Sequence, residues 1–478
     1  MAETGFNVPK RLRRAEGLLR HGGHGGDRGA SYDEGSHDVG NLARHTRMPG
    51  GPGGAMVPVP VPVLIAALLC ICAFLLVACD TSSSASVSSP APGASATPTT
   101  PLVEAHTYTG PPMSEVLQNS ALVDLAIGAS SEGWAVGQNE VILHLQGGRW
   151  YVEQAPPGGG FSGSNSYLNL VATAADSSTG SESTEGIEGA AEAWAYSNHN
   201  ALLRRKGGRW ETVANPSQAT LSDLVVTQTS DAWAVGKIYG GVMSSKTQGA
   251  SMYYGAGSGR WSVVDLPSEN GSTEPSSETD SVTPSELAVS PSGATWALAG
   301  NVMLRADEGT SRWELLTLPP PVTEDRLSDL AFSADGTLWV LGDKAIWRYK
   351  PSGEDQREDQ GEATPGILWE RFAGENIEST LERWRGASLS VSQDGTQAWV
   401  LAFARTEPGT FAEQAFLLLD LRSGKLTQVS SPSDLLIHDV EWAAGGEAWA
   451  VGGSGQRGGQ GIILHYKDGE WSVYEPTK

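Results

Sequence analysis

Hydrophobic and polar positions alternate in short runs that recur from about residue 120 to the end of the chain. The stretch from Glu132 to Pro156, EGWAVGQNEVILHLQGGRWYVEQAP, contains two short apolar runs, a Gly-Gly turn and a third run that begins at Trp150. The stretch from Glu447 to Pro476, EAWAVGGSGQRGGQGIILHYKDGEWSVYEP, repeats this order. Short alternating runs between turn residues are typical of β-strands, so each copy predicts a small antiparallel sheet.

Copies of this pattern align on a Trp of the second predicted strand. An alternating strand precedes each aligned Trp, and a third strand and a fourth, usually opened by Trp, follow it. The sixth copy departs, since its fourth strand, KLTQVSSP, has no Trp. A period near 50 residues with four strands a copy is typical of β-propellers, and predicts an all-β, seven-bladed β-propeller of four-stranded antiparallel blades over residues 118–478. The aligned residues are Trp134, Trp194, Trp233, Trp296, Trp339, Trp399 and Trp449.

A closed ring is the physical solution for such copies, because a single small sheet cannot bury both of its faces. Closing the ring buries every face and leaves only short edges. We expect the repeated Trp residues to fill the gaps between blades. The last copy is complete, so the ring can close without a swapped strand; alternatively, Thr107–Gln118 supplies one.

Three segments of different composition precede the repeats. Residues 1–56 are rich in Gly, Arg and His without an apolar period, which predicts a disordered tail. Residues 57–79 are apolar, and residues 80–117 are a Ser/Thr/Pro-rich linker and lead-in that predicts a flexible spacer.

The apolar segment predicts a signal or membrane anchor. Its unbroken run, Val63–Ala78, is close to the length of a signal-peptide apolar region and short against the ~20 residues of a spanning helix. Leu76-Val77-Ala78-Cys79 resembles the bacterial lipobox, and by that resemblance Cys79 carries a lipid. A 78-residue leader is long for a signal peptide, so translation from Met48 or an uncleaved N-terminal anchor is the alternative. Lipoprotein and anchor both place the body at the membrane on the extracytoplasmic side.

Charge and cysteine content narrow the function classes. The formal net charge of −23 argues against a nucleic-acid partner, which needs a basic face. The first 56 residues hold 8 Lys/Arg against 6 Asp/Glu, whereas the rest of the chain holds 24 against 49. All three cysteines, Cys70, Cys72 and Cys79, lie in the apolar segment, so we expect no disulfide framework, metal site or cofactor in the body.

One turn of the pattern resembles known repeat families. Ser333-Ala334-Asp335-Gly336-Thr337-Leu338-Trp339 is similar to the turn of bacterial propeller repeats, as are Ser290–Trp296 and Ser392–Trp399. These families include the BNR/Asp-box, two-component-regulator propeller and photosystem II assembly-factor types, with related WD/YVTN-like repeats. The resemblance implies a propeller fold over about residues 118–478. It implies little about function, since these families include sensors, assembly factors, glycan binders and glycosidases.

Motifs for ligand binding or catalysis are weak in this sequence. The sequence Gly453–Gly458 matches GxGxxG but lies between two predicted strands, with no helix start to bind a phosphate. His144 and His465 occupy matching places in third strands, which suggests an exposed strand position rather than a catalytic base. A sialidase-like enzyme needs clustered arginines around a tyrosine, and nothing in their spacing groups the candidates, which are Arg305, Arg405, Arg457 and Tyr239.

Loop lengths favour one end of the ring as the binding face. In a four-stranded antiparallel blade, the second-to-third and the blade-to-blade connections emerge at the same end, and most long connections are of these kinds. This end, called the long-loop end below, also holds most loop aromatics, and loops on rigid scaffolds carry function. Two acidic insertions, Asp176–Glu192 and Pro351–Gly366, fall at the opposite end. The candidate aromatics are Phe161, Tyr167, Tyr239, Trp384 and Phe411.

An acidic residue stands ten positions before most of the aligned Trp residues, near the start of the first strand. We expect these carboxylates to circle the channel mouth at the long-loop end. They either accept hydrogen bonds from backbone N–H groups of a neighbouring turn or attract a cation or basic partner. The second copy has Asn169 at this position and the sixth has Ser388. The five acids are Asp124, Asp223, Glu286, Asp329 and Asp439.

Together these features favour a membrane-anchored, extracytoplasmic propeller that binds a protein or a glycan and is not an enzyme. The alternative is a cell-surface carbohydrate-active hydrolase or lyase, because abundant Asp and Glu leave a carboxylate pair possible.

Overall fold

A computed structural model describes residues 108–476, apart from residues 129, 157–166, 174–191, 240–246, 268–281, 351–367, 406–412 and 455–458. The predicted tail, the apolar segment with Cys79 and most of the linker lie outside the described residues. Across the part of the chain that the structure describes, no helix is long and apolar enough to cross a membrane.

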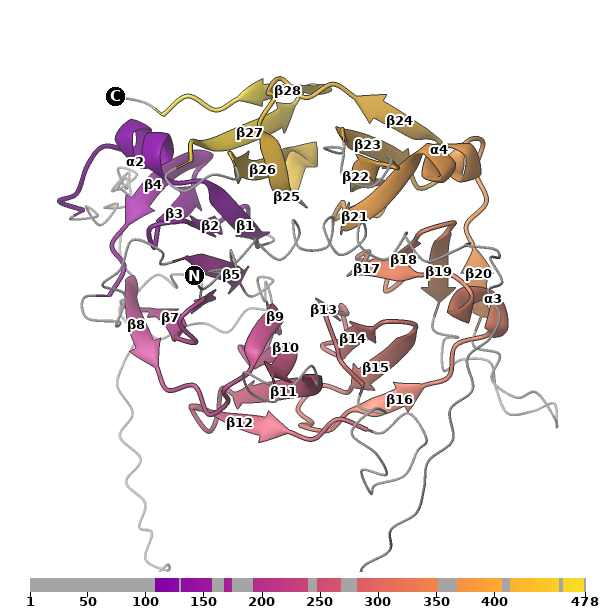
Figure 1. Ribbon diagram of the computed structural model, residues 1–478, viewed down its shortest axis with the longest axis horizontal. Helices are drawn as coiled ribbons and strands as arrows, with labels where there is room; N and C mark the ends of the chain where they lie inside the picture. The colour runs from indigo at the N-terminus through magenta and orange to yellow at the C-terminus, as the bar shows by residue number, and fades with distance from the viewer. Residues whose placement is uncertain are drawn as a thin grey trace, which may run out of the picture. The chain divides into compact units, whose positions relative to one another are not determined.

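Seven sheets of four antiparallel strands make up the fold, which confirms the predicted seven-bladed propeller. Each sheet, or blade, takes its four strands consecutively from the chain, and the blades follow one another around a ring in chain order (Figure 1). The first strand of each blade lies nearest the centre of the ring, and the fourth lies at its rim.

The first four blades contain strands of three to nine residues. Blade 1 comprises β1 (Leu122–Ile127), β2 (Gly133–Gly137), β3 (Ile142–Gln146) and β4 (Arg149–Glu153). Blade 2 comprises β5 (Leu168–Thr173), β6 (Ala193–Ser197), β7 (Leu202–Lys206) and β8 (Arg209–Val213). Blade 3 comprises β9 (Thr220–Val226), β10 (Ala232–Tyr239), β11 (Thr247–Gly255) and β12 (Arg260–Val264). Blade 4 comprises β13 (Glu286–Val289), β14 (Thr295–Ala299), β15 (Val302–Ala306) and β16 (Glu314–Leu316).

The last three blades follow the same order. Blade 5 comprises β17 (Leu327–Phe332), β18 (Leu338–Gly342), β19 (Ile346–Lys350) and β20 (Leu368–Arg371). Blade 6 comprises β21 (Trp384–Val391), β22 (Gln397–Ala404), β23 (Gln414–Asp420) and β24 (Leu426–Val429). Blade 7 comprises β25 (Leu436–Trp442), β26 (Ala448–Gly453), β27 (Gly461–Lys467) and β28 (Glu470–Val473). Helices α2 (Met113–Asn119), α3 (Pro320–Thr323) and α4 (Ile377–Arg383) and the 3₁₀ turn η1 (Ala444–Gly446) lie between strands or before them.

The ring closes without a swapped strand, because blade 7 takes all its strands from the C-terminal segment. The alternative in which Thr107–Gln118 supplies a strand is therefore wrong. The second half of that stretch belongs to helix α2, whose Val116 and Leu117 pack with Val451 and Ile463 of blade 7 in one hydrophobic cluster. The helix covers the seam between the last blade and the first (Figure 1).

The repeated Trp residues are core, as expected. All seven aligned Trp side chains are at most 5% exposed, and each packs in the layer between two blades. Trp233 of blade 3 lies 4.5 Å, between ring centroids, from Trp313 of blade 4. Trp449 of blade 7 similarly contacts Trp150 of blade 1 at 5.7 Å, edge to face. Large aromatic side chains thus hold neighbouring blades together.

A β-bulge explains the recurring WAVG sequence. In blades 1, 3, 5 and 7 the first strand shifts register by one residue opposite the glycine that ends this motif or its equivalent. A Cβ atom at Gly236 would lie 2.2 Å from the Thr220 carbonyl oxygen, and one at Gly452 would lie 2.0 Å from that of Leu436. Only glycine allows the bulged strand to approach so closely.

The Ser-x-Asp-Gly-Thr turn closes the hairpin between first and second strands. In blade 5, Asp335 Oδ1 accepts hydrogen bonds from the Ser333 hydroxyl at 2.6 Å and the Thr337 N–H at 3.0 Å. Gly336 has φ 80°, the left-handed conformation that favours glycine. The Trp339 indole N–H donates to the Ser333 hydroxyl at 3.3 Å, so the turn also positions the aligned Trp.

Candidate functional site

The five predicted acidic residues lie on the first strands of blades 1, 3, 4, 5 and 7, which face the centre of the ring (Figure 1). Glu286, Asp329 and Asp439 are buried, with 4%, 6% and 0% of their surface exposed. Asp124 and Asp223 are half-buried. The acids are therefore mostly withdrawn from solvent.

Four of these carboxylates each bridge two blades. Each aspartate follows the bulge of its own first strand, and one oxygen accepts a hydrogen bond from a backbone N–H on the first strand of the next blade. Asp439 completes the set across the seam where the ring closes. The bonds are Val171 N–H to Asp124 (2.8 Å), Leu287 N–H to Asp223 (2.7 Å), Leu389 N–H to Asp329 (2.8 Å) and Leu125 N–H to Asp439 (3.1 Å).

The second oxygen of three of these aspartates accepts the N–H of the residue that follows it. The distances are 2.8 Å for Asp223, 2.9 Å for Asp329 and 2.6 Å for Asp439. The sequence predicts that these carboxylates accept hydrogen bonds from backbone N–H groups of a neighbouring turn. The carboxylates do accept such bonds, but the donors lie on the first strand of the next blade rather than in a turn. Attraction of a cation or a basic partner by these acids stays a prediction.

In blade 2, the position predicted by counting back from the aligned Trp is wrong by one residue. In blade 2 the register pairs Ala172 with Trp194 and Leu170 with Tyr196. The counterpart of the bridging aspartates is therefore Leu170, while Asn169 lies in the bulge. In blade 4 the paired part of the first strand begins at Glu286 itself and runs without a register shift to Val289.

The two predicted binding aromatics differ in exposure. Tyr239 ends β10 and is 49% exposed, with the Lys237 ammonium 5.2 Å from its ring centroid. Trp384 is 2% exposed and packs against Ile377 and Leu381 of α4. The interpretation of Trp384 as a surface aromatic is wrong, because helix α4 covers it. Phe161 and Phe411 lie outside the described residues.

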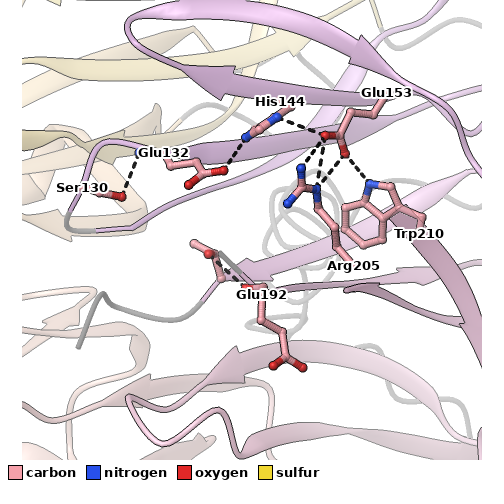
Figure 2. A network of polar contacts seen from close by, with 8 residues as sticks. Ser130, Glu132, His144, Glu153, Glu192, Arg205 and Trp210 are labelled. Carbon is pink, nitrogen blue, oxygen red and sulfur yellow. Dashed lines mark hydrogen bonds and ion pairs between the residues drawn. The ribbon is translucent and has the colours of Figure 1, made fainter. Parts of the chain in front are cut away.

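A buried polar network joins blades 1 and 2 (Figure 2). His144 is 1% exposed and stacks on Trp134, with ring centroids 4.8 Å apart, so its predicted exposed position is wrong. Its Nε2 lies 2.7 Å from Glu132 Oε1, and its Nδ1 lies 3.0 Å from Glu153 Oε1. Glu153 also accepts hydrogen bonds from Arg205 of blade 2 at 3.0–3.2 Å and from the Trp210 indole at 2.6 Å.

Electrostatics keep this network charged. Burial by itself lowers the His144 pKa, but hydrogen bonds to Glu132 and Glu153 outweigh it, so the pKa is raised above its ordinary value. Burial by itself raises the Glu153 pKa, but bonding to His144 and the charge of Arg205 lower it to about 2. Two carboxylates thus face a guanidinium and an imidazole whose protonated form they favour, the pairing that a buried charge needs.

In four successive blades, 7, 1, 2 and 3, an acidic side chain pairs with a side chain that lies over the aligned Trp. His465 stacks on Trp449 at 3.9 Å and lies 2.9 Å from Glu447. In blade 2, Arg204 pairs with Glu192, and in blade 3, the Tyr253 hydroxyl donates to Asp231 at 2.8 Å. In the sequence of all four blades, an acidic residue stands two positions before the aligned Trp. This spacing is the signal from which the network could have been predicted.

The candidate catalytic residues are not assembled. Arg305 pairs with Asp307 in blade 4, Arg405 bonds to Leu381 in blade 6, and Tyr239 belongs to blade 3. Arg457 lies outside the described residues. Among the described residues, no three His, Cys, Asp or Glu side chains are grouped to hold a metal ion.

Solved structures share the fold at low identity, whereas no protein-family model and no curated protein sequence matches. YCF48 bound to a D1 peptide is 16% identical, with TM-score 0.47, over 73% of this chain and 93% of that chain. YCF48 from Cyanidioschyzon merolae is 15% identical, with TM-score 0.46, over 73% and 95%. The β-propeller domain of Myceliophteria thermophila Cps50 (Swd1) is 11% identical, with TM-score 0.47, over 72% and 96%. A function for this chain therefore has to come from its own residues.

Proposed function

We propose that this chain is a membrane-anchored, extracytoplasmic scaffold whose long-loop end binds a partner protein. The ring supplies a rigid body, since hydrogen bonds and aromatic contacts join successive blades. Rigid scaffolds with variable connections at one end present binding surfaces on those connections.

Exposure of Tyr239 is the observation that carries this proposal. Tyr239, at 49%, is the more exposed of the two large aromatic side chains that are exposed in the described part of the chain, the other being Tyr151 at 37%. Tyr239 ends the second strand of blade 3, which places it at the long-loop end. Tyrosine is enriched among the anchor residues of protein interfaces, because its ring buries a large area at little entropic cost.

The hydrolase or lyase alternative has less support. A carbohydrate hydrolase needs two carboxyl groups that face a substrate. At the centre of the ring, four of the five candidate carboxylates accept backbone hydrogen bonds across blade seams. These groups serve assembly of the ring, and this favours the scaffold function.

Attachment to the membrane rests on the sequence. The apolar segment 57–79 ends in the lipobox-like Leu76–Cys79, and the Ser/Thr/Pro-rich spacer that follows separates the propeller from the bilayer.

Site-specific cross-linking tests the binding end. A photoreactive phenylalanine at position 239 of the full chain, expressed in cells, should yield a discrete cross-linked protein band. The same residue at position 151 is the matched control, because Tyr151 is exposed on β4 at the rim. Equal bands from both positions, or a band from position 151 alone, would contradict the proposal.

A further inference from the structure

The fourth strand of blade 6 lacks a Trp that other blades share. In blades 1, 2, 3, 5 and 7, the third-strand residue that follows the partner of the aligned Trp pairs with a fourth-strand Trp. The equivalent pair in blade 6 is Leu419 and Leu426. Leucine thus stands where these blades carry the larger indole ring. The fourth-strand residues of the five blades are Trp150, Trp210, Trp261, Trp369 and Trp471.

A fourth-strand Trp packs into the seam with the preceding blade. Trp261 of blade 3, for example, lies 5.1 Å, between ring centroids, from Trp194 of blade 2. In the seam between blades 5 and 6, Phe372 contacts the aligned Trp339 instead, at 4.9 Å. Helix α4 packs in the same hydrophobic cluster and fills part of this seam. The missing indole is therefore replaced only in part.

A pocket of about 210 Å³ remains between α4 and the outer strands of blade 6. Helix α4 lies beside the outer part of this blade (Figure 1). The buried side chains of Trp384, Leu417 and Leu426 give the pocket an apolar lining. Exposed polar residues also line it, so it opens to solvent and offers apolar surface and hydrogen-bonding groups together. They include Ser379, Arg383 and Gln428.

The volume of the pocket fits a single aromatic side chain. Sites for small molecules usually measure about 300 Å³ or more, so this pocket is small for a metabolite. A cavity of about 150 Å³ is large enough to hold a benzene ring. A tyrosine side chain combines such a ring with a hydroxyl group, which can bond to the polar lining. Tyrosine therefore matches both the size and the mixed lining of the pocket.

The outer edge of β24 carries a strand-like pairing that a side chain makes. The Leu426 N–H donates to Asn376 Oδ1 at 2.8 Å, and Asn376 Nδ2 donates to the Leu426 carbonyl at 2.7 Å. The Asn376 amide thus takes the place that a peptide group of a neighbouring strand has in a sheet. Because backbone groups alternate along a strand, the N–H and C=O of Gln428, two residues further on, face the same edge.

We propose that the rim of blade 6 binds an extended, tyrosine-bearing segment of a partner protein. The segment pairs with the edge of β24 at Gln428, and its tyrosine ring enters the α4 pocket. In this mode of recognition, main-chain hydrogen bonds give affinity and the pocket gives specificity. The surface belongs to blade 6, whereas Tyr239 belongs to blade 3. The inference therefore goes beyond the proposed function and does not depend on it.

A peptide-binding measurement on the full chain tests this inference. The probe is a fluorescent peptide with the sequence Ser-Thr-Val-Tyr-Val-Thr-Ser, which favours an extended conformation. Replacing its tyrosine with alanine should weaken binding by about tenfold or more, the loss typical of removing a buried aromatic anchor. Replacing it with phenylalanine should weaken binding less, because the ring stays and only the hydroxyl is lost.

Filling the pocket from inside should block it. Leu426→Trp restores the residue that five other blades carry at this position and should weaken binding of the tyrosine peptide by about tenfold or more. The variant should unfold at no lower urea concentration than wild type, because filling a cavity stabilises a fold. Val263→Trp, at an exposed position of the outer strand of blade 3, is the matched control and should bind the peptide as wild type does.

A second pair of variants tests the pairing with the strand edge. Gln428→Pro removes an N–H that faces outward, a position at which edge strands tolerate proline. It should weaken binding by about threefold or more, the loss of a backbone hydrogen bond. Gln428→Ala keeps this N–H and should weaken binding less. Equal losses for the two variants would contradict the strand pairing.

Hydrogen exchange provides a readout that needs no variant. The tyrosine peptide should slow exchange in α4 and β24 of the wild-type protein, and protection confined to other blades would contradict the proposed site. Failure of wild type to bind the tyrosine peptide, or equal affinities of wild type and Leu426→Trp, would overturn the inference. Either result leaves the cross-linking test at position 239 unaffected, because that test probes blade 3.

Discussion

At the scale of single residues, the bridging aspartates hold neighbouring blades of the ring together. A carboxylate can accept from donors on two different blades, whereas an amide offers a single acceptor oxygen. The same residues that suggest a ligand site in the sequence therefore serve assembly in the structure.

Replacing Asp329 with Asn should destabilise the protein by about 1–3 kcal/mol, because one buried N–H, of Leu330 or Leu389, loses its acceptor. Equilibrium denaturation measures this loss, and the exposed Asp307→Asn should change stability by less than about 0.5 kcal/mol. The loss should be the same with and without calcium. A calcium-dependent rise of the wild-type melting temperature that Asp329→Asn removes would instead favour the cation-binding interpretation.

The His144 network predicts a pH dependence of stability. The folded-state pKa of His144 is raised above the ordinary 6.5, so its contribution is fully present below pH 6.5 and is lost as pH rises through the folded pKa. The Glu153 pKa is lowered from 4.5 to about 2, so its contribution is fully present above pH 4.5 and is lost as pH falls toward 2. Both contributions coincide between pH 4.5 and 6.5.

The matched comparison is His144→Gln, measured by denaturation across this range. Wild type should exceed the variant by about 1–3 kcal/mol near pH 5.5, the cost of leaving buried charged groups without a partner, and the difference should shrink at alkaline pH. A difference that is constant from pH 5 to pH 9 would show that His144 contributes through packing alone.

At the scale of elements, each aligned Trp links the second strand of one blade to the blade beside it. Trp233→Ala should lower the free energy of unfolding by about 3–5 kcal/mol, because it removes a buried ring that packs on Tyr253 and Trp313. Tyr151→Ala, at an exposed aromatic of an outer strand, should cost less than about 1 kcal/mol. Similar losses for both variants, measured by urea denaturation, would contradict the assignment of Trp233 to the core.

The strands and blades could be predicted from the sequence, because strand alternation, Gly turns and aligned Trp residues are local signals. The Gly147-Gly148 hairpin turn, for example, has positive φ at both residues, which the sequence Gly-Gly anticipates. Side-chain partners could not be predicted, because they depend on contacts between blades. Glu153 meets Arg205 across 52 residues, and Trp384 is covered by a helix that its own loop forms.

Contacts between blades 5 and 6 show the same limit. Asp343 and Arg405 are 62 residues apart and meet only when blades 5 and 6 pack side by side. Neither residue is distinguished by its local sequence. The counting error at Asn169 has a different cause, because the long connection between β5 and β6 interrupts the ten-residue spacing that holds in blades 1, 3, 5 and 7, which carry the same bulge.

At the scale of the whole molecule, the proposal joins the propeller to a lipid anchor. Metabolic labelling with a fatty-acid analogue should mark the wild-type chain, and Cys79→Ala should remain as an unlabelled precursor, because the lipobox-like sequence provides its acceptor thiol at this position. Cys70→Ala, in the same apolar segment, is the matched control and should be labelled like wild type. An unlabelled wild type would favour the uncleaved anchor.

Closure of the ring without an exchanged strand has a mechanical consequence. Blades 1 and 7 meet through side chains, helix α2 and a backbone-to-carboxylate hydrogen bond, so no strand from one end of the chain is locked into the sheet of the other. We expect tension on the chain ahead of residue 108 to reach α2 and its contacts with blade 7 first, because α2 is the first helix or strand of the described residues. A propeller pulled from that side would therefore meet the load first at the seam between blades 1 and 7.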